Sequence, residues 1–471
     1  MAFWAVVGLL GMTGLLSAGH ALLRKRDPRA ALGWIMLCLG VPGVGAGLYW
    51  LLGVNRIQTR ARVWMRRGVK QFWQDSGITP PATPVVSLLG GDLQPLQRLA
   101  DHLTRRPLLP GNRLQILHNG EEAYPAMLAA IAGARQSVFL STYIFDSDQT
   151  GRRFADALRQ AAARGVDVRV LVDALGERYS FPPARRLFKG SGIRTARFLP
   201  PLAGGGLHLN LRNHRKLLIV DRQLGFTGGM NIGDRHLTAG SPPGCVVDIQ
   251  FQVEGPVVAQ MEQAFLEDWH FATRQALRPA PPRAWAPAGG AFCRGISDGP
   301  NEEYDQLSWL LIGILNCARH RVRIMTPYFI PDRPLISAIN AASLRGVAVE
   351  IILPEKNNLP YLAWASMSYL WEFLVYGTRI FFQPPPFVHS KVLLMDEEYA
   401  LVGSANLDPR SLRLNFEFNL EVYDRVTAET LGRHFEAVRS RSRETSLAEM
   451  DARPLPVKLR DAFAKLFSPY L

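Results

Sequence analysis

The sequence predicts an α/β protein made of two similar halves that share one active site, preceded by two N-terminal membrane helices. Three observations lead to this fold class. Two apolar runs open the chain, a strand–helix–strand pattern occurs twice after them, and each copy leads into the same polar residues at the same spacing. The length of 471 residues also exceeds that of one ordinary domain.

The composition indicates a folded protein with an anionic partner. Hydrophobic residues make up 48% of the chain and charged residues 20%, as in globular proteins. The formal net charge of +14 suits nucleic acid, phosphate esters or an acidic membrane surface, and its sign does not distinguish among them. None of the 4 cysteines lies in a C-x-x-C pair. We therefore expect neither a disulfide framework nor a structural zinc site.

The first apolar run covers residues 3–23 and the second covers residues 30–54. Each is about long enough for a hydrocarbon layer of ~30 Å, which needs roughly 20 residues. Basic residues follow the first run instead of preceding it, unlike in a signal peptide. We therefore expect residues 1–55 to be an anchor of two transmembrane helices.

Basic residues are more numerous after the second run than between the runs, which favours a cytoplasmic catalytic portion. A re-entrant hairpin would instead place both basic sets on one side.

Residues 56–105 are expected to form a juxtamembrane linker. Within it, residues 60–74 place Met65, Val69 and Phe72 on one face of a helix, with basic residues around them. Such a helix suits the headgroup layer of a membrane. A linker helix packed on the soluble part of the chain fits the pattern equally well.

The internal repeat begins after this linker. In the first half, Arg135–Phe145 and Val166–Val172 have strand patterns separated by a helical stretch, and Gly165 is expected to end that helix. The second half repeats the order from Arg319 onward. This order predicts right-handed crossovers and a mostly parallel sheet. A Pro-rich linker, residues 278–290, separates the halves, so we expect domains at 106–280 and 291–471.

Each half ends in the pattern H-x-K-x4-D-x6-G-[GS]-x-N. Its members are His214, Lys216, Asp221, Gly228, Gly229 and Asn231 in the first half, and His389, Lys391, Asp396, Gly403, Ser404 and Asn406 in the second. In H-x-K within a strand, both side chains point to one face. The glycine-containing turn before the Asn lets the backbone approach a phosphate. One copy would be explained by a surface strand, but two copies at identical spacing argue against that.

The residue types in this pattern suit phosphodiester transfer. That reaction needs a nucleophile, a proton donor for the leaving alcohol, and cations beside the phosphate oxygens. Two histidines can serve as the first two and two lysines as the third, so no metal or other cofactor is required. The catalytic candidates are His214, Lys216, Asp221, His389, Lys391 and Asp396, of which the two aspartates are expected to brace turns. The substrate-binding candidates are Asn231, Asn406, Ser404 and Gly229.

Two further carboxylates are candidates for orienting the histidines. A histidine nucleophile needs its second nitrogen held by an acceptor. When the stretches VVDIQFQV and NFEFNLEV are aligned, Asp248 and Glu417 fall in register. Each is expected to orient the histidine of its own half, and the alternative is an ordinary surface carboxylate. The other histidines are not expected to be catalytic. His208, in a Gly-rich stretch before the first motif, belongs to a lid or a lipid-contacting edge in our interpretation.

The paired motifs resemble those of the phospholipase D superfamily, and further stretches resemble its bacterial cardiolipin synthase branch. These stretches are YIFDSDQTGRR (143–153), GGMNIGD (228–234), FLEDWHFAT (265–273), TPYFIPD (326–332) and GSANLDPRSLRLNFEFN (403–419). The resemblance covers nearly the whole chain. It implies two phospholipase D-like α-β-α sandwich domains with a shared active site at a pseudo-two-fold interface. One departure is GCVVD before Asp248, where relatives often carry a Trp.

The resemblance also implies a reaction. His214 would attack the phosphorus of phosphatidylglycerol, and His389 would protonate the departing glycerol. A second phosphatidylglycerol would then displace His214 to give cardiolipin. The implied location is the bacterial inner membrane, with a multi-pass anchor and cytoplasmic catalytic domains. The residues alone leave open which histidine is the nucleophile, which lipid or alcohol is the acceptor, the membrane side and the oligomeric state.

Three other functions compete with this one. A hydrolytic phospholipase D would use the same site with water as the acceptor. A membrane-tethered nuclease would suit the +14 charge, but the chain lacks an obvious basic module with interleaved aromatic residues. A non-catalytic lipid-binding scaffold is disfavoured because both motifs are intact.

Overall fold

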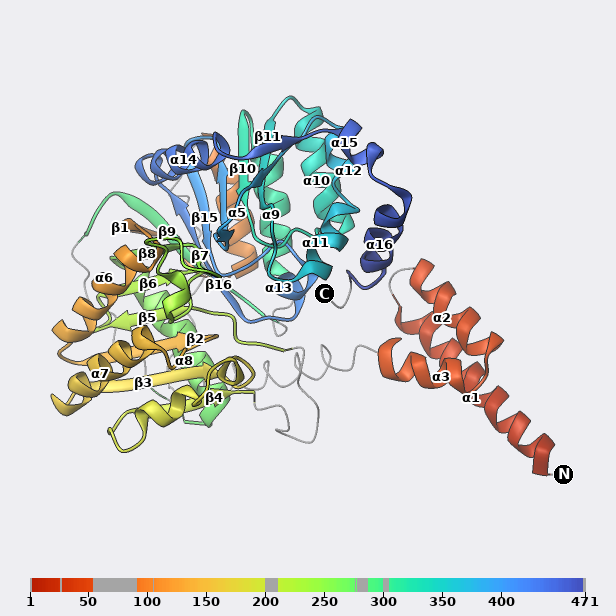
Figure 1. Cartoon of the computed structure of the whole chain (residues 1–471), viewed down its shortest axis with the longest axis horizontal. Helices are drawn as coiled ribbons and strands as arrows, with labels where there is room; N and C mark the ends of the chain where they lie inside the picture. The colour runs from red at the N-terminus through yellow and green to blue at the C-terminus, as the bar shows by residue number, and fades with distance from the viewer. Residues whose placement is uncertain are drawn as a thin grey trace. The chain divides into compact units, whose positions relative to one another are not determined.

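The computed structural model describes residues 2–25, 28–53, 91–104, 106–199, 211–275, 277, 287–299 and 305–468 (Figure 1). The chain divides into two compact units, residues 1–63 and 64–471. The described part of the N-terminal unit contains α1 (Ala2–Arg24), α2 (Pro28–Gly40), α3 (Val44–Leu48) and the π-helical turn η1 (Tyr49–Gly53). The predicted amphipathic helix at 60–74, the stretch around His208 and most of the Pro-rich linker lie outside the described residues.

The N-terminal unit has one helix of membrane-spanning length among the described residues, α1. The prediction of a second continuous span over 30–54 is wrong, because the chain turns at Val41–Gly43 between α2 and α3. Pro42 restricts the residue before it to extended conformations, and Gly43 has φ +86°. With 13 residues, α2 reaches only about 20 Å at ~1.5 Å per residue, less than a hydrocarbon layer.

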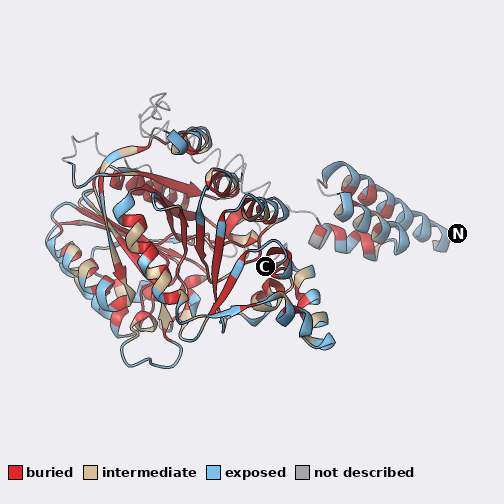
Figure 2. Cartoon of the chain, turned by 90° about the horizontal axis from the view of Figure 1, so that it is seen from above, coloured by how far each residue is buried: buried red, intermediate tan, exposed pale blue. Residues whose placement is uncertain are grey.

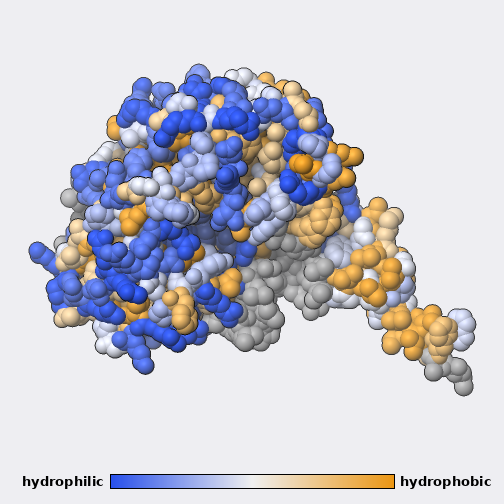
Figure 3. Space-filling view, viewed as in Figure 1, coloured by the Kyte–Doolittle hydropathy of each residue, from blue (hydrophilic) through white to orange (hydrophobic). Residues whose placement is uncertain are grey.

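Residues 28–53 instead form a hairpin along α1. At its tip, a Cβ on Gly43 would lie 2.6 Å from Leu10 Cδ2. At its base, Lys25 Nζ donates to the Gly53 carbonyl at 2.5 Å. Most α1 side chains are exposed and apolar (Figures 2 and 3), which suits a lipid environment. Both ends of the hairpin lie beside the C-terminal end of α1, as in a re-entrant segment of a membrane protein.

The second unit is built on one 15-stranded sheet, whose order is β17-β12-β11-β10-β14-β15-β16-β9-β1-β8-β6-β5-β2-β3-β4. The strands of the first half are β1 (Leu109–His118), β2 (Ser137–Thr142), β3 (Asp167–Asp173), β4 (Arg194–Phe198), β5 (Leu217–Val220), β6 (Leu224–Gly228) and β8 (Ile249–Glu254). Those of the second half are β9 (Ala291–Asp298), β10 (Arg321–Met325), β11 (Ala348–Pro354), β12 (Arg379–Gln383), β14 (Val392–Met395), β15 (Tyr399–Gly403), β16 (Glu417–Tyr423) and β17 (Arg443–Thr445). Antiparallel pairing of β1 with β9 joins the two halves into one sheet.

The expectation of a mostly parallel sheet is wrong. Among the described strands, parallel pairing in this sheet is confined to β2–β3–β4 and β10–β11–β12. The remaining pairs are antiparallel because each motif strand, β5 or β14, continues through a tight turn into the next strand. The two strand–helix–strand stretches recognised in the sequence, β2–α7–β3 and β10–α10–β11, are parallel crossovers, and each is followed by one further parallel strand, β4 or β12.

Helices cover both faces of the sheet in each half. In β2, Val138 and Leu140 belong to the core beneath α6 and α7, whereas Phe139 stacks on Phe265 of α8 at 5.0 Å between ring centroids. Alternate residues of a strand point to opposite faces, so α8 lies on the other face. The helices around this half are α6 (Asn119–Gly133), α7 (Gln149–Ala163), η3 (Gly176–Tyr179), η4 (Ala184–Phe188), η6 (Asp234–His236) and α8 (Val258–Thr273).

The second half has the same layers. Its helices are η2 (Gly91–Leu93), α5 (Gln94–Thr104), α9 (Gln306–Cys317), α10 (Arg333–Leu344), α11 (Pro360–Met367), α12 (Trp371–Leu374), α13 (Pro409–Arg413), α14 (Arg425–Arg439), α15 (Leu447–Ala452) and α16 (Leu455–Leu466). In this half α5 packs with α9 through Leu96 and Ala100, so residues 94–104 belong to the core and not to a linker.

Equivalent residues begin and end the crossover helices of the two halves, α7 and α10. An Asp N-cap accepts a backbone hydrogen bond at the start of each, Asp148 for α7 and Asp332 for α10. Gly165 and Gly346 both have φ +88° just after these helices, a conformation that glycine adopts without strain. The chain thus enters β3 and β11 at equivalent positions.

Candidate active site

The two motif histidines lie just before β5 and β14, not within these strands as H-x-K periodicity predicted. Each motif segment pairs with the opposite half. The His214 backbone N–H donates to the Phe416 carbonyl at 2.9 Å, and the His389 N–H donates to the Val247 carbonyl at 2.8 Å. The second contact extends a two-stranded parallel sheet of β7 (Val246–Val247) and β13 (Phe387–Val388). Both histidines are therefore positioned by backbone from both halves.

The carboxylates that hold the histidines are exchanged between the halves. His214 Nδ1 lies 3.0 Å from Glu417 Oε2, and His389 Nδ1 lies 2.8 Å from Asp248 Oδ2. The prediction that each carboxylate orients the histidine of its own half is wrong. The physical reason is the backbone pairing just described, which places each motif segment beside the start of the carboxylate-bearing strand of the other half.

These contacts determine which imidazole nitrogen can react. A carboxylate oxygen only accepts, so Nδ1 carries the hydrogen in both rings and the neutral ring keeps its lone pair on Nε2. Neither Nε2 has a hydrogen-bond partner among the described residues. His214 and His389 both line one pocket of about 350 Å³. Two unpaired nitrogen lone pairs therefore border one cavity.

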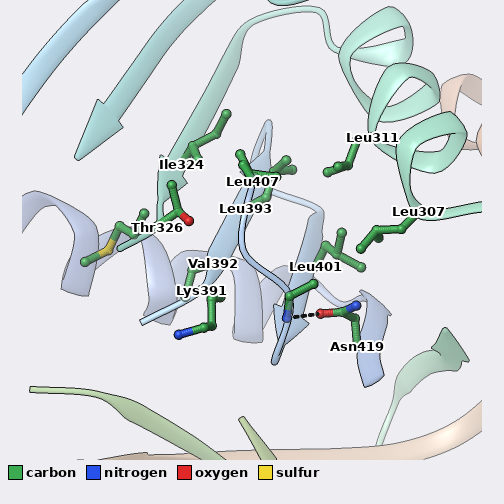
Figure 4. A pocket seen from close by; sticks show the side chains of 12 residues that line it. Leu307, Leu311, Ile324, Thr326, Lys391, Val392, Leu393, Leu401, Leu407 and Asn419 are labelled. Carbon is green, nitrogen blue, oxygen red and sulfur yellow. Dashed lines mark hydrogen bonds between the residues drawn. The ribbon is translucent and has the colours of Figure 1, made fainter. Parts of the chain in front are cut away.

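The two motif lysines are buried beside the histidines. Lys216 Nζ donates to the His214 carbonyl at 2.7 Å, and Lys391 Nζ donates to the His389 carbonyl at 2.5 Å. Burial lowers the pKa of Lys216 to about 7 and that of Lys391 to about 8, and their mutual repulsion adds to the shift of Lys216. The stem of Lys391 borders a small cavity lined mainly by apolar side chains (Figure 4).

The charged groups of the site shift one another's pKa values. Burial, followed by the charge of Lys391, lowers the pKa of His389 to about 3. Burial also lowers the pKa of His214. Burial alone would raise the pKa of Asp248 and Glu417, but their histidine partners and the nearby lysines outweigh it and hold both pKa values below the ordinary range. An anion between the lysines would offset their repulsion and favour protonation of a histidine.

The motif asparagines lie at the same pocket. Asn231 Oδ1 accepts from the Ile144 backbone N–H at 3.1 Å, which directs its amide nitrogen elsewhere. Asn406 Nδ2 contacts Ser411 Oγ at 3.2 Å. Both asparagines line the pocket with the histidines. Both predicted asparagines therefore border the same cavity as the histidines.

Gly229 and Ser404 were predicted to bind substrate, and this prediction is wrong. Ser404 is fully buried and its Oγ donates to Glu417 Oε2 at 2.5 Å. A Cβ on Gly229 would lie 2.4 Å from Asp248 Oδ2. Both residues therefore contact the orienting carboxylates from behind, because this turn packs against the next strand and not against the cavity.

The glycines before them, Gly228 and Gly403, are required by close strand packing. A Cβ on Gly228 would lie 2.6 Å from the Ile249 carbonyl oxygen, and one on Gly403 would lie 2.4 Å from the Phe418 carbonyl oxygen. Neither glycine approaches the pocket.

The motif aspartates brace the sheet and do not touch the pocket. Asp221 Oδ1 accepts from the backbone N–H groups of Gln136 and Ser137 at 2.7 and 2.9 Å. Asp396 Oδ1 does the same for His320 and Arg321 at 2.8 and 2.9 Å. Asp221 and Asp396 therefore anchor the starts of β2 and β10, in agreement with the expectation that they brace turns, and neither lines the pocket with the other catalytic candidates.

Several lining residues were not selected from the sequence: Tyr143, Arg212, Arg235, His236, Tyr328 and Arg410. The Tyr143 ring meets the His214 imidazole at 5.4 Å and lies 5.6 Å from Lys216 Nζ. Burial raises the pKa of both Tyr143 and Tyr328, which keeps these phenols neutral. The signal that could have found the tyrosines is their position in the matching stretches YIF and YFI.

The arrangement defines an enzyme that transfers a phosphodiester group through a paired-histidine site of the phospholipase D type. Comparison with known proteins agrees. The family described as "Cardiolipin synthase, PLD-like domain" matches residues 127–269 and 311–439. Cardiolipin synthase A of Pseudomonas fluorescens is 33% identical over 100% of this chain and 98% of its own length. The major cardiolipin synthase of Bacillus subtilis is 30% identical over 95% of each chain. The chain belongs to the cardiolipin synthase family with phospholipase D-like domains.

A solved structure supports the fold. The phosphatidylserine synthase of Haemophilus influenzae superposes with a TM-score of 0.62 over 80% of this chain and 100% of that chain, at 16% sequence identity. At this identity the likeness concerns the arrangement of the two halves only.

Proposed function

We propose that this protein transfers a phosphatidyl group from one phosphatidylglycerol to another, giving cardiolipin and glycerol through a phosphohistidine intermediate. The observation that carries the proposal is the pair of carboxylate-held histidines whose Nε2 atoms border one pocket. The full-length similarity to cardiolipin synthases supports the choice of reaction.

In the first step, Nε2 of His214 attacks the phosphorus of the donor lipid. The bond from phosphorus to the glycerol oxygen breaks, and that oxygen takes a proton from Nε2 of His389. His389 is neutral in the empty site because burial lowers its pKa to about 3. The donor's anionic phosphate supplies the negative charge that raises this pKa and lets His389 act as an acid.

In the second step, the hydroxyl of a second phosphatidylglycerol gives its proton to Nε2 of His389. Its oxygen forms a bond to phosphorus, and the bond from phosphorus to His214 breaks. Lys216, Lys391, Asn231 and Asn406 hold the phosphate oxygens in both steps. The proton borrowed in the first step is returned in the second, so the enzyme ends unchanged.

The N-terminal unit supplies the membrane anchor of this proposal. Arg24 and Lys25 end the exposed apolar helix α1, and the hairpin brings Gly53 back beside Lys25. The basic residues between Arg56 and Lys70 follow directly in the sequence. Basic residues flank membrane segments on the cytoplasmic side, so we assign the catalytic unit to the cytoplasmic face of the inner membrane.

The test is the product formed from labelled phosphatidylglycerol by the purified full chain in vesicles. Labelled cardiolipin with an equal amount of free glycerol supports the proposal. Phosphatidic acid as the main product would replace it with a phospholipase D that hydrolyses its substrate. Cleavage of DNA without either lipid product would favour a nuclease.

A further inference from the structure

We propose that the phosphate which the acceptor lipid brings with it binds in a groove beside His389, between Arg235 and Lys356. This inference rests on the proposed function and adds a specificity site to it. The groove would select an anionic phospholipid over a neutral alcohol or water as the acceptor.

The reaction itself requires a second anion site. Cardiolipin holds two phosphates joined by one glycerol, so the acceptor's own phosphate must lie one glycerol away from the reacting phosphorus. In an in-line displacement the acceptor oxygen enters where the leaving oxygen departed. With His214 as nucleophile, that position is on the His389 side of the pocket.

A groove of about 560 Å³ lies on that side. It shares Arg235, Val246, Asn358 and Phe387 with the catalytic pocket, so the two are continuous. The Phe387 ring lies 6.0 Å from the His389 imidazole. A glycerol that reaches His389 therefore has this groove beside it.

The charges in the groove suit a phosphate. Among the residues that the structure describes, its lining includes Arg235 and Lys356 and no carboxylate. Arg235 Nε and Nη2 both donate to Asp146 Oδ2, at 3.1 and 2.8 Å, which fixes the guanidinium and leaves Nη1 without a partner among the described residues. Lys356 is exposed, and its ammonium has no partner within the same part of the chain. The exposed Lys356 ammonium and one partnerless nitrogen of the Arg235 guanidinium, whose charge is paired with Asp146, thus border one groove.

The other half of the repeat has no lysine at the position that corresponds to Lys356. Since β3 and β11 pair in the same way with β2 and β10, Lys356 corresponds to Leu175 and Asn358 corresponds to Glu177. Glu177 is buried and lies 3.6 Å from Arg185. A phosphate on the His214 side would meet an apolar residue and a carboxylate at these two positions, although Arg212 and Arg410 also line the pocket with His214. The lysine is therefore specific to the His389 side, which is the acceptor side when His214 is the nucleophile.

The experiment compares two acceptors on one enzyme. The full chain in labelled phosphatidylglycerol vesicles is given ethanol, so that cardiolipin and phosphatidylethanol form in competition from one intermediate. We expect Lys356→Ala to lower the ratio of cardiolipin to phosphatidylethanol about tenfold, as the loss of one charged hydrogen bond predicts. Lys356→Glu should lower it further, and Lys356→Arg should restore it.

Lys189→Ala is the matched control, because Lys189 is an exposed lysine that lines neither cavity. A ratio in Lys356→Ala equal to that in Lys189→Ala would overturn the inference, as would an equal loss of both products in Lys356→Glu. The proposed function fails separately, if the unmodified enzyme makes phosphatidylethanol or phosphatidic acid but no cardiolipin.

Discussion

Glu417 holds His214 across the interface between the two halves, with 3.0 Å between the carboxylate oxygen and Nδ1. Asp248 holds His389 in the opposite direction at 2.8 Å. Each half thus contributes a histidine to one pair and a carboxylate to the other. Neither half contains a complete catalytic pair.

Replacing these carboxylates by amides tests whether each one orients the histidine of the other half. Glu417→Gln and Asp248→Asn keep the side-chain shape but permit the wrong imidazole tautomer. We expect kcat for cardiolipin formation to fall roughly 10³–10⁴-fold, as in other carboxylate–histidine pairs, with a smaller change in KM. Unchanged kcat in either variant would show that its carboxylate does not orient a histidine. Glu267→Gln is a suitable control, since Glu267 lies on α8 and not in the pocket.

The lysines predict how activity depends on pH. The pKa of Lys216 is about 7 and that of Lys391 about 8 in the empty site, and kcat/KM reports ionisations of the free enzyme. We expect kcat/KM to fall as pH rises through 7–8, because the ammonium charges that we propose to hold the phosphate are lost. In Lys216→Arg the charge persists, so the decline should begin at higher pH. A flat profile from pH 6.5 to 9 would contradict this assignment.

The lowered pKa of Lys216 also predicts that the folded protein gains stability when this lysine is replaced by an apolar residue. Its folded pKa of about 7 lies below the ordinary value of 10.5, so the unfolded chain binds more protons between these values and stability rises with pH across that window. Lys216→Met should therefore be inactive but more stable than the wild type at pH 7 and below, by at most about 4–5 kcal/mol at about 1.4 kcal/mol per pKa unit, and the loss of the charge beside Glu417 should reduce this gain. The difference should shrink toward pH 10.

Unfolding monitored at several pH values measures this effect. A variant less stable than the wild type at pH 6 would mean that the hydrogen bond from Lys216 Nζ to the His214 carbonyl outweighs the cost of burying the charge.

The local parts of the site could be predicted from the sequence. The spacing of His214 and Asn231 and its repetition in the second half identified four residues that line the pocket, and the same pattern identified the buried lysines beside the histidines. The partner of His214 could not be predicted, because a duplicated chain allows each carboxylate to serve either half. The choice depends on pairing between segments 203 residues apart.

Other predictions from the sequence were wrong for similar physical reasons. The motif turn indicated that Gly229 and Ser404 closely approach another group. Only the packing of the strands shows that this group is an orienting carboxylate and not the substrate. The break in the second apolar run was visible as Pro42–Gly43. Membrane helices tolerate these residues, so the sequence alone did not require an interruption there.

The phosphohistidine is the most direct test of the mechanism. Full-length enzyme is mixed with phosphatidylglycerol labelled in its acyl chains, quenched within one turnover, digested and analysed by mass spectrometry. We predict a phosphatidyl group on His214, its absence in His214→Ala, and its transfer to cardiolipin when unlabelled lipid is added before the quench. Label on His389 instead of His214, or cardiolipin formed by His214→Ala, would contradict the account.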